Sequence, residues 1–457
     1  MARGKKKEEV LTPEEKLQQA LVPESEWPYK VPENWCWVKH NAILDISGGA
    51  QPSKSLFSSE PREGYTRLFQ TRDYGDHPVP VYIPEKYATK TTSEGDILLA
   101  RYGGSLGKVF WAHDGAYNVA LAKVIRLYPN ILDDGYLYQY YLSFFYQDFC
   151  VKASSGRSAQ AGFNRNDMEV LILPLPPLPE QQRIVDRIES LFAKLDEAKE
   201  KAQVVVDGFE DRKEAILHKA FAGELTKGWR IANNISHSWE TVLFGSIIVE
   251  GPQNGLYKPK TAYGQGTKIL RIDGFYDGYL EPWDSLKRLS LEEDEKSMYL
   301  LHINDIVVNR VNSMPFLGKS ALIRELPEDC VFESNIMRIA IDLKRANPEY
   351  IIRYLNSSSG LIELRKNAKQ AVNQASINQQ DVRAVSIPLP YLKEQTAIVD
   401  LLDNLIIKEL HAKESAEQVI ALIDTIKKSI LARAFRGELG TNDPSDESVE
   451  ELLEKTI

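Results

Sequence analysis

The stretch Ile172-Leu173-Pro174-Leu175-Pro176, with Glu180-Gln181 just after it and Ala220-Phe221-Ala222-Gly223-Glu224-Leu225 further on, occurs twice in this chain. The second version is Ser386-Ile387-Pro388-Leu389-Pro390, then Glu394-Gln395 and Ala434-Phe435-Arg436-Gly437-Glu438-Leu439. The two stretches, 164–225 and 378–439, lie 214 positions apart and align without a gap. A repeat of this length indicates a head-to-tail duplication, which can present two similar surfaces to a target.

The duplication extends upstream into short apolar segments. Residues 34–38 match 238–242, 66–70 match 267–271, 96–101 match 305–310, and 106–108 match 317–319. The polar segments between them have diverged. Because loops carry most binding function, we expect the two copies to bind different targets in the same way.

Each repeat predicts a long helix with a heptad seam after its proline-rich entry. About five heptads correspond to a helix of roughly 50 Å. The seam positions are Ile184, Ile188, Leu191, Leu195, Ala198, Ala202, Val205, Phe209 and Ile216 in the first repeat, and Ile398, Leu402, Leu405, Ala412, Ala416, Val419, Ile423, Ile426 and Ile430 in the second.

The two helices are expected to pack against each other in antiparallel fashion. The first helix leaves the first domain and leads to the second, so the second helix packs along it only by running back. Arg212 and Glu409 are polar exceptions in the seam. The alternative is that each helix packs on its own domain, but such a helix usually shows a broader apolar stripe.

The composition is that of an ordinary globular protein, with 43% apolar and 26% charged residues. Its 457 residues suit two to four domains, and no apolar run reaches membrane-spanning length. The net charge of −9 is concentrated on the helices and tails, which leaves both variable domains near neutral and able to carry a basic face. Ordinary solubilising charge explains the same distribution equally well. Three scattered cysteines and the absence of a signal-like N-terminus predict a cytoplasmic protein.

No catalytic or metal-binding motif is found in the sequence. Gly318-Lys319-Ser320 lacks the upstream glycine of a phosphate-binding loop, and Gly107-Lys108 fails in the same way. Asn347-Pro348-Glu349-Tyr350 departs from the methyltransferase motif at Glu349 and is better explained as a helix start. The seven histidines show no zinc spacing. We therefore expect no catalytic residues and no metal ligands in this chain.

With its duplicated Pro-Leu-Pro…Glu-Gln entries and Ala-Phe-x-Gly-Glu-Leu exits, the chain resembles the specificity subunits of type I restriction-modification systems over roughly 30–440. The resemblance implies an α/β (α+β) fold: two mixed, β-rich target-recognition domains separated by a pair of long antiparallel coiled-coil helices, with an internal pseudo-two-fold repeat. The expected parts are a charged leader (1–26), recognition domain 1 (27–163), a central conserved helical region (164–226), recognition domain 2 (227–377), a distal helical region (378–440) and an acidic tail (441–457). The leader (from Pro13 to Leu21) and the tail could each hold a short helix.

The resemblance also implies partners and cofactors. Each domain would read one half of a bipartite double-stranded DNA target, and the helices would bind two methyltransferase subunits, which restriction and translocase subunits join. S-adenosylmethionine, ATP and Mg²⁺ would be held by those subunits and none by this chain. Apolar positions outside the seam, such as Val204, Val206 and Ile420, suggest that partners cover the helices.

Base readers need paired donors or acceptors: Arg suits guanine, and Asn or Gln suits adenine. Residues of these types, with lysines for phosphate contacts, recur in loops and at strand ends. Gln70 and Arg271 occupy matching positions, which predicts adenine in one half-site and guanine in the other at that point. The candidates are Lys54, Gln70, Arg72, Arg101, Tyr102, Lys108, Arg157 and Gln160 in the first domain, and Lys258, Lys260, Arg271, Arg310, Asn312, Lys319, Lys369, Gln370 and Gln374 in the second.

Each candidate has a plainer explanation. A solvated surface charge accounts for any of the Arg and Lys residues, and core packing accounts for Trp35 and Trp239. Tyr102 suits base stacking, but a core or rim aromatic is the better interpretation. A rival function is a non-DNA-binding coiled-coil scaffold with tandem protein-binding modules; the recurrence of Arg, Lys, Asn and Gln in the loops of both copies argues against it.

Overall fold

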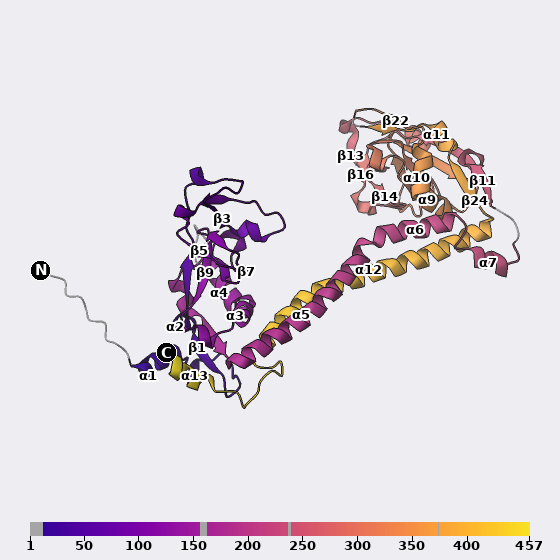
Figure 1. Ribbon diagram of the computed structural model, residues 1–457. Coiled ribbons are helices and arrows are strands. Elements are labelled where there is room, and N and C mark those ends of the chain that lie inside the picture. Colours follow the sequence, from indigo (N-terminus) through magenta and orange to yellow (C-terminus); the bar gives the residue numbers. More distant parts are fainter. Residues whose placement is uncertain (1–11, 156–161, 236–238, 373) are drawn as a thin grey trace. The chain divides into compact units, whose positions relative to one another are not determined.

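The computed structural model describes residues 12–155, 162–235, 239–372 and 374–457 (Figure 1). The chain divides into two compact units. The first consists of 1–201 and 418–457, and the second of 202–417. Each unit therefore contains one β-rich domain together with part of each conserved helical region.

The first unit is built on two four-stranded sheets. One has the order β2 (Leu44–Gly48), β9 (Leu121–Arg126), β6 (Ile97–Ala100), β7 (Val109–Trp111), and the other β4 (Tyr82–Pro84), β3 (Tyr65–Phe69), β8 (Gly115–Tyr117), β5 (Thr91–Thr92). A separate antiparallel pair joins β1 (Cys36–Lys39) to β10 (Ile172–Leu175). The helices α2 (His40–Ile43), α3 (Asp134–Leu142) and α4 (Phe144–Ser155) complete this domain.

The second unit repeats this topology. Its main sheet has the order β12 (Ile248–Asn254), β21 (Ile336–Ile341), β17 (Ile306–Asn309), β19 (Ser320–Leu322), and the next sheet the order β16 (Lys287–Leu289), β13 (Tyr263–Leu270), β20 (Cys330–Phe332). The pair β11 (Glu240–Leu243) and β24 (Ser386–Leu389) matches β1 and β10. Additional elements are β14 (Phe275–Tyr276), β15 (Tyr279–Leu280), β18 (Val311–Asn312), β22 (Lys369–Gln370), β23 (Ala375–Ser376), α7 (Lys227–Ala232), α8 (Glu293–Met298), α9 (Pro348–Asn356), α10 (Ser358–Arg365) and α11 (Gln379–Arg383). The predicted duplicated, mixed α+β fold is confirmed.

A buried glutamine joins each domain to its long helix. Gln181 Oε1 accepts from the Asp133 backbone N–H at 2.8 Å, and its Nε2 donates to the carbonyls of Ile131 and Pro176 at 2.9 Å. Asp133 also caps α3 with its side chain. Its equivalent in the second unit, Asn347, caps α9 in the same way.

The second unit repeats these contacts 214 residues later. Gln395 accepts from the Asn347 backbone N–H at 2.7 Å and donates to the carbonyls of Arg345 and Pro390 at 3.0 and 2.7 Å. The side-chain amide is satisfied in the same way in both units, so the constant offset of 214 residues reaches back into the β-rich domains.

The two conserved helical regions differ in continuity. The second forms one helix, α12 (Leu392–Ala434), whereas the first forms α5 (Leu178–Asp207) and α6 (Phe209–Phe221), separated at Gly208. The single helix expected for the first repeat is thus corrected to two. Glycine costs about 1 kcal/mol relative to alanine in a helix, and the Arg212 guanidinium donates to the Val205 carbonyl beside the break at 2.8 Å.

Contacts within each unit confirm that the helices pair in antiparallel fashion. In the first unit α5 lies along α12 (Figure 1), with Asp196 paired to Lys427 and Lys199 to Asp424. In the second unit the two polar exceptions pair with each other, because Arg212 Nε lies 2.7 Å from Glu409 Oε2. Residue numbers rise along one helix where they fall along the other, as antiparallel packing requires.

Most of the predicted seam is buried or half-buried. Ile184, Ile188, Ile398, Leu402 and Ile423 are almost fully buried. Val419, however, is 44% exposed, and Ala198 and Ala412 are exposed as well. A pair of helices covers only a narrow stripe, so positions at its margin stay open.

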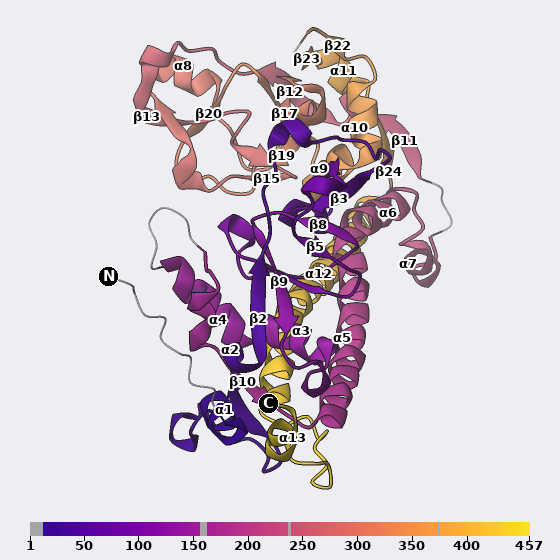
Figure 2. The same cartoon turned by 60° about the vertical axis from the view of Figure 1, so that its left-hand side comes forward.

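The first and last helices of the described residues pack on the first domain. The helix α1 (Pro13–Ala20), capped by Thr12, contacts α13 (Val449–Thr456), and the two lie side by side in Figures 1 and 2. Val449 and Leu453 are fully buried in the core of the first unit. The two short helices expected at the ends are therefore present, with Ser448 preceding the last one.

The predicted packing role of Trp35 is also confirmed. Its side chain is 3% exposed, and Nε1 donates to Glu180 at 2.7 Å. Glu180 accepts further bonds from Thr441 and Asn442 near the C-terminus. In the second unit the equivalent Glu394 is held by Thr226 and Arg230 instead, each at 2.6 Å.

Among the helices of the described residues, none is long and apolar enough to cross a membrane.

Replacing Gln181 with leucine should destabilise the first unit by about 2–4 kcal/mol, because one N–H and two carbonyls would be left buried without partners. Gln182→Leu is the matched control, since Gln182 is exposed and its side chain donates to the neighbouring Asp186 on the same helix. Thermal unfolding should show a clear loss for the first variant and little change for the control. Equal melting temperatures would contradict the proposed role of Gln181.

Candidate DNA-recognition surfaces

In the second unit, the loop 333–335 brings two candidate arginines together. Arg271 Nε lies 3.3 Å from Glu333 Oε2, and the same carboxylate accepts from the Ile272 N–H at 2.6 Å. Arg310 donates from its backbone N–H to the Asn335 carbonyl and from Nη1 to the Ser334 carbonyl, at 2.8 and 3.2 Å. The loop fixes both side chains with main-chain and carboxylate oxygens.

Loop 118–120 does the same in the first unit. The Arg101 backbone N–H donates to the Ala120 carbonyl and Nη2 to the Val119 carbonyl, both at 2.8 Å. Arg101 and Arg310 therefore share one arrangement: a strand end, a backbone bond to the loop, and a guanidinium bond to the carbonyl one residue earlier. Each side chain is half-buried, with its Nε buried and lacking a described partner. Each guanidinium has further N–H groups that can donate hydrogen bonds to a ligand.

The expected correspondence of Gln70 and Arg271 agrees with the strand registers. Phe69 pairs with Tyr117 in a parallel ladder, and Leu270 pairs with Phe332 in the equivalent ladder. Gln70 and Arg271 are the next residues, so they leave equivalent strands at equivalent points. Both are half-buried.

A small sheet gathers four further candidates on the second domain. The strands β18, β23 and β22 pair so that Asn312 lies opposite Ala375, which lies opposite Gln370. Lys369, Gln370 and Gln374 are exposed, and Arg310 immediately precedes β18. Polar residues distant in sequence thus meet in one small sheet.

In the first domain, the described residues form an isolated bridge at this place. Tyr102 pairs with Gly162, and the Arg101 guanidinium lies 4.9 Å from the Tyr102 ring centroid. A Cβ on Gly162 would fall 2.2 Å from the Tyr102 ring, so this ring packs directly on the glycine backbone. The half-buried Tyr102 is a rim aromatic. Arg157 and Gln160 lie outside the described residues.

Two candidate lysines are held by other protein groups. Lys319 Nζ lies 3.6 Å from the Tyr276 ring centroid and within 6 Å of the rings of Phe275 and Phe316. Burial lowers the pKa of Lys319, against the opposing effect of Asp273, Glu281 and Asp277. Lys258 forms an ion pair with Glu295 at 2.7 Å. By contrast, Lys54, Arg72, Lys108 and Lys260 are exposed side chains.

A glycine in each unit allows the close approach that positions the arginine-binding loop. A Cβ on Gly49 would lie 2.1 Å from the Asn118 carbonyl oxygen, and one on Gly255 would lie 2.3 Å from the carbonyl oxygens of Phe332 and Glu333. Sequence reasoning missed these glycines and both loops. The signal was a glycine directly after each of the equivalent strands β2 and β12, but the loop that it approaches lies far along the chain.

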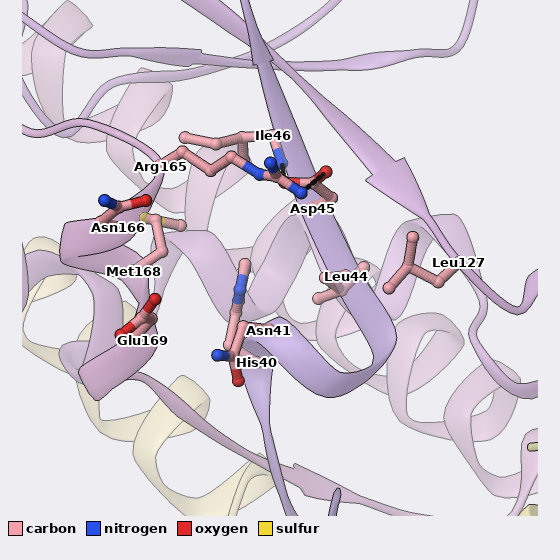
Figure 3. Close-up of a pocket in the computed structure, with 10 residues that line it drawn as sticks. All are labelled: His40, Asn41, Leu44, Asp45, Ile46, Leu127, Arg165, Asn166, Met168 and Glu169. Atoms are coloured by element: carbon pink, nitrogen blue, oxygen red, sulfur yellow. Dashed lines mark hydrogen bonds and ion pairs between the residues drawn. The ribbon is translucent and has the colours of Figure 1, made fainter. Parts of the chain in front are cut away.

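A polar cavity of about 290 Å³ lies apart from these candidates in the first domain (Figure 3). His40, Asp45 and Arg165 are among its lining residues, and Arg165 Nη2 donates to Asp45 at 2.6 Å. His40 Nε2 lies 2.7 Å from the Tyr141 hydroxyl, and burial lowers the pKa of His40 to about 4. A neutral, fully buried histidine beside a surface ion pair is a structural group.

No metal-binding cluster of His, Cys, Asp and Glu occurs in the part of the chain that the structure describes. Asn347 and Pro348 begin α9, as expected, with the Asn347 side chain accepting from the Glu349 N–H.

The family model for the type I restriction modification DNA specificity domain matches residues 32–205 and 254–419, more than half of the chain. The EcoKI specificity subunit of Escherichia coli is 25% identical over 424 residues, covering 90% of each chain. The StySPI specificity subunit of Salmonella potsdam is 24% identical over 426 residues with the same coverage. The HsdS subunit from Thermoanaerobacter tengcongensis has a similar fold, with a TM-score of 0.61, 20% identity, and coverage of 91% of this chain and all of that one.

Gly49→Ala and Gly255→Ala should each destabilise the chain by about 1–3 kcal/mol, because the new methyl group would overlap a backbone carbonyl. Gly104→Ala and Gly228→Ala are matched controls: no atom lies within 4 Å of their added Cβ and neither glycine has a positive φ. Thermal unfolding of the four variants tests this. If the first two variants melt with the controls, the close approach is not a constraint.

Proposed function

The chain belongs to the family of type I restriction-modification DNA specificity subunits, and on that premise we propose that each of its two domains reads one half of a bipartite DNA target. As a specificity subunit, it is a non-catalytic component of its restriction-modification system. The observation that carries the proposal is the matched pair of arginines, Arg101 and Arg310, on equivalent loops of the two domains.

Their geometry suits base recognition. A guanidinium held by a carbonyl has already lost part of its side-chain freedom, so less is lost when its free donors meet a base edge. Arginine pairs best with the O6 and N7 acceptors of guanine. We assign Arg101 and Arg310 as readers at equivalent points of the two half-sites.

Gln70 and Arg271 are a second equivalent pair with different chemistry. Glutamine suits adenine and arginine suits guanine, so the half-sites should differ there. The exposed Lys54, Arg72, Lys108, Lys260 and Lys369 are suited to phosphate contacts, which position a protein without selecting a sequence.

We assign the paired helices two roles, as a spacer and as the docking surface for two methyltransferase subunits. Exposed apolar side chains on the helices support docking: Val204 is 66% exposed, Ile407 51% and Leu422 55%. Restriction and translocase subunits would join that core. The partners would supply S-adenosylmethionine, ATP and Mg²⁺.

Methylation mapping tests the proposal directly. The chain is combined with the methyltransferase subunit encoded beside it and incubated with random duplex DNA, and modified sites are sequenced. We expect one bipartite motif with a fixed spacer. Arg310→Ala should relax recognition in one half of that motif and Arg101→Ala in the other, by about 1–3 kcal/mol per lost contact. No methylation at all would favour a scaffold that does not bind DNA, and methylation at a continuous motif would contradict the reading of two separate half-sites.

Adding one heptad to both helical regions should lengthen the preferred spacer by about three base pairs, because seven helical residues add about 10 Å and each base pair about 3.4 Å. The insertions belong between Lys199 and Phe209 and between Lys413 and Asp424, which leaves the flanking ion pairs intact. A heptad in one helix alone is the control and should abolish binding by breaking the pairing. An unchanged spacer after the paired insertion would rule out the spacer role.

A further inference from the structure

The turn that follows Arg310 and β18 in the second domain differs from the equivalent turn after Arg101 in the first domain. In the second domain it is the short 3-10 helix Met314–Phe316, and in the first it is Gly103–Ser105. Two equivalent backbone hydrogen bonds align the turns of the two domains. The Gly318 N–H donates to the Asn309 carbonyl, and the Gly107 N–H donates to the Ala100 carbonyl. Met314-Pro315-Phe316 therefore stands where the first domain has Gly103-Gly104-Ser105.

The apolar turn presents large side chains to solvent. Met314 is 36% exposed and Phe316 47% exposed, whereas the matching turn of the first domain has no apolar side chain. Two neighbouring exposed apolar side chains on one turn form a small apolar tip. A feature found in one copy only also cannot serve a partner that binds both copies alike.

The turn is held rigidly. Leu317, directly after it, is fully buried, and Arg365 donates to the carbonyls of Pro315 and Leu317 at 3.2 and 2.8 Å. Lys319 lies 5.8 Å from the Phe316 ring centroid. The backbone beneath the two exposed side chains is therefore held before binding, so binding adds no cost for ordering the turn.

Its surroundings are polar and cationic. Arg310 and Asn312 lie a few residues before the turn, and the exposed Lys369 lies on the same small sheet as Asn312. Arg365 and Lys319 contact the turn itself. An apolar tip with basic residues beside it complements a stack of bases between phosphates better than it complements a neutral protein surface.

We propose that Met314 and Phe316 form an apolar wedge that enters between two adjacent base pairs of the half-site read by the second domain and unstacks them. This inference rests on the proposed function, since it requires the second domain to bind DNA. The first domain, with Gly103-Gly104-Ser105 at this place, leaves its half-site stacked. Pyrimidine–purine steps unstack most easily, so the wedge selects a base step without a hydrogen bond to it.

The test uses the complex with methyltransferase subunits and its mapped target, carrying 2-aminopurine at successive positions. Binding should raise the fluorescence at one step of the second half-site through unstacking. The triple variant Met314→Gly, Pro315→Gly, Phe316→Ser, which copies the first domain, should lose that signal and bind about tenfold more weakly. Any signal from a base extruded for methylation should persist in the variant.

Val249→Ser is the matched control, because Val249 is a 67% exposed apolar residue of the same domain. Unfolding temperatures establish that both variants are folded. Specific binding with no signal lost in the triple variant overturns the wedge and leaves the proposed function standing. If no bipartite target exists, the proposed function fails and the wedge fails with it.

Discussion

The buried amide at the first turn of each long helix is the interaction on which the rest of the architecture depends. Gln181 and Gln395 each satisfy one backbone N–H and two carbonyls that would otherwise be buried without partners. These groups come from the segment before a domain helix and from the proline that follows β10 or β24. A shift of the domain against the start of its helix would break three hydrogen bonds at once, so the β-rich domain and the start of its helix move as one body.

This rigid junction explains why the rest of each domain has been free to diverge. Tyr136 and Tyr350 donate to equivalent proline carbonyls at 2.6 Å, repeating the 214-residue offset inside the domains. Beyond the junction the offset drifts, as turns of different length join conserved strands. Loops 118–120 and 333–335 still make the same bonds to Arg101 and Arg310, so backbone geometry has been kept while side chains changed.

Much of this organisation could be predicted from local patterns. The heptad pattern predicted the pair of helices, and chain connectivity predicted that they run antiparallel. The matched apolar segments predicted equivalent strands in the two domains. The break at Gly208 could not be predicted, because one glycine within a strong heptad rarely ends a helix. The ion pair between Arg212 and Glu409 could not be predicted either. Each residue is a polar exception in its own helix, and only the contact between the two helices brings them together. Reader candidates were found by residue type, but the loops that hold them depend on contacts between residues far apart in the chain.

The discontinuity of the first unit has a consequence for biosynthesis. The second unit is one uninterrupted segment, 202–417, and can close its core as soon as that segment has left the ribosome. The first unit draws Val449 and Leu453 into its core, so its apolar surface stays incomplete until α13 has been translated. The first domain is therefore completed after the second. Loss of α13 would damage the first domain and spare the second.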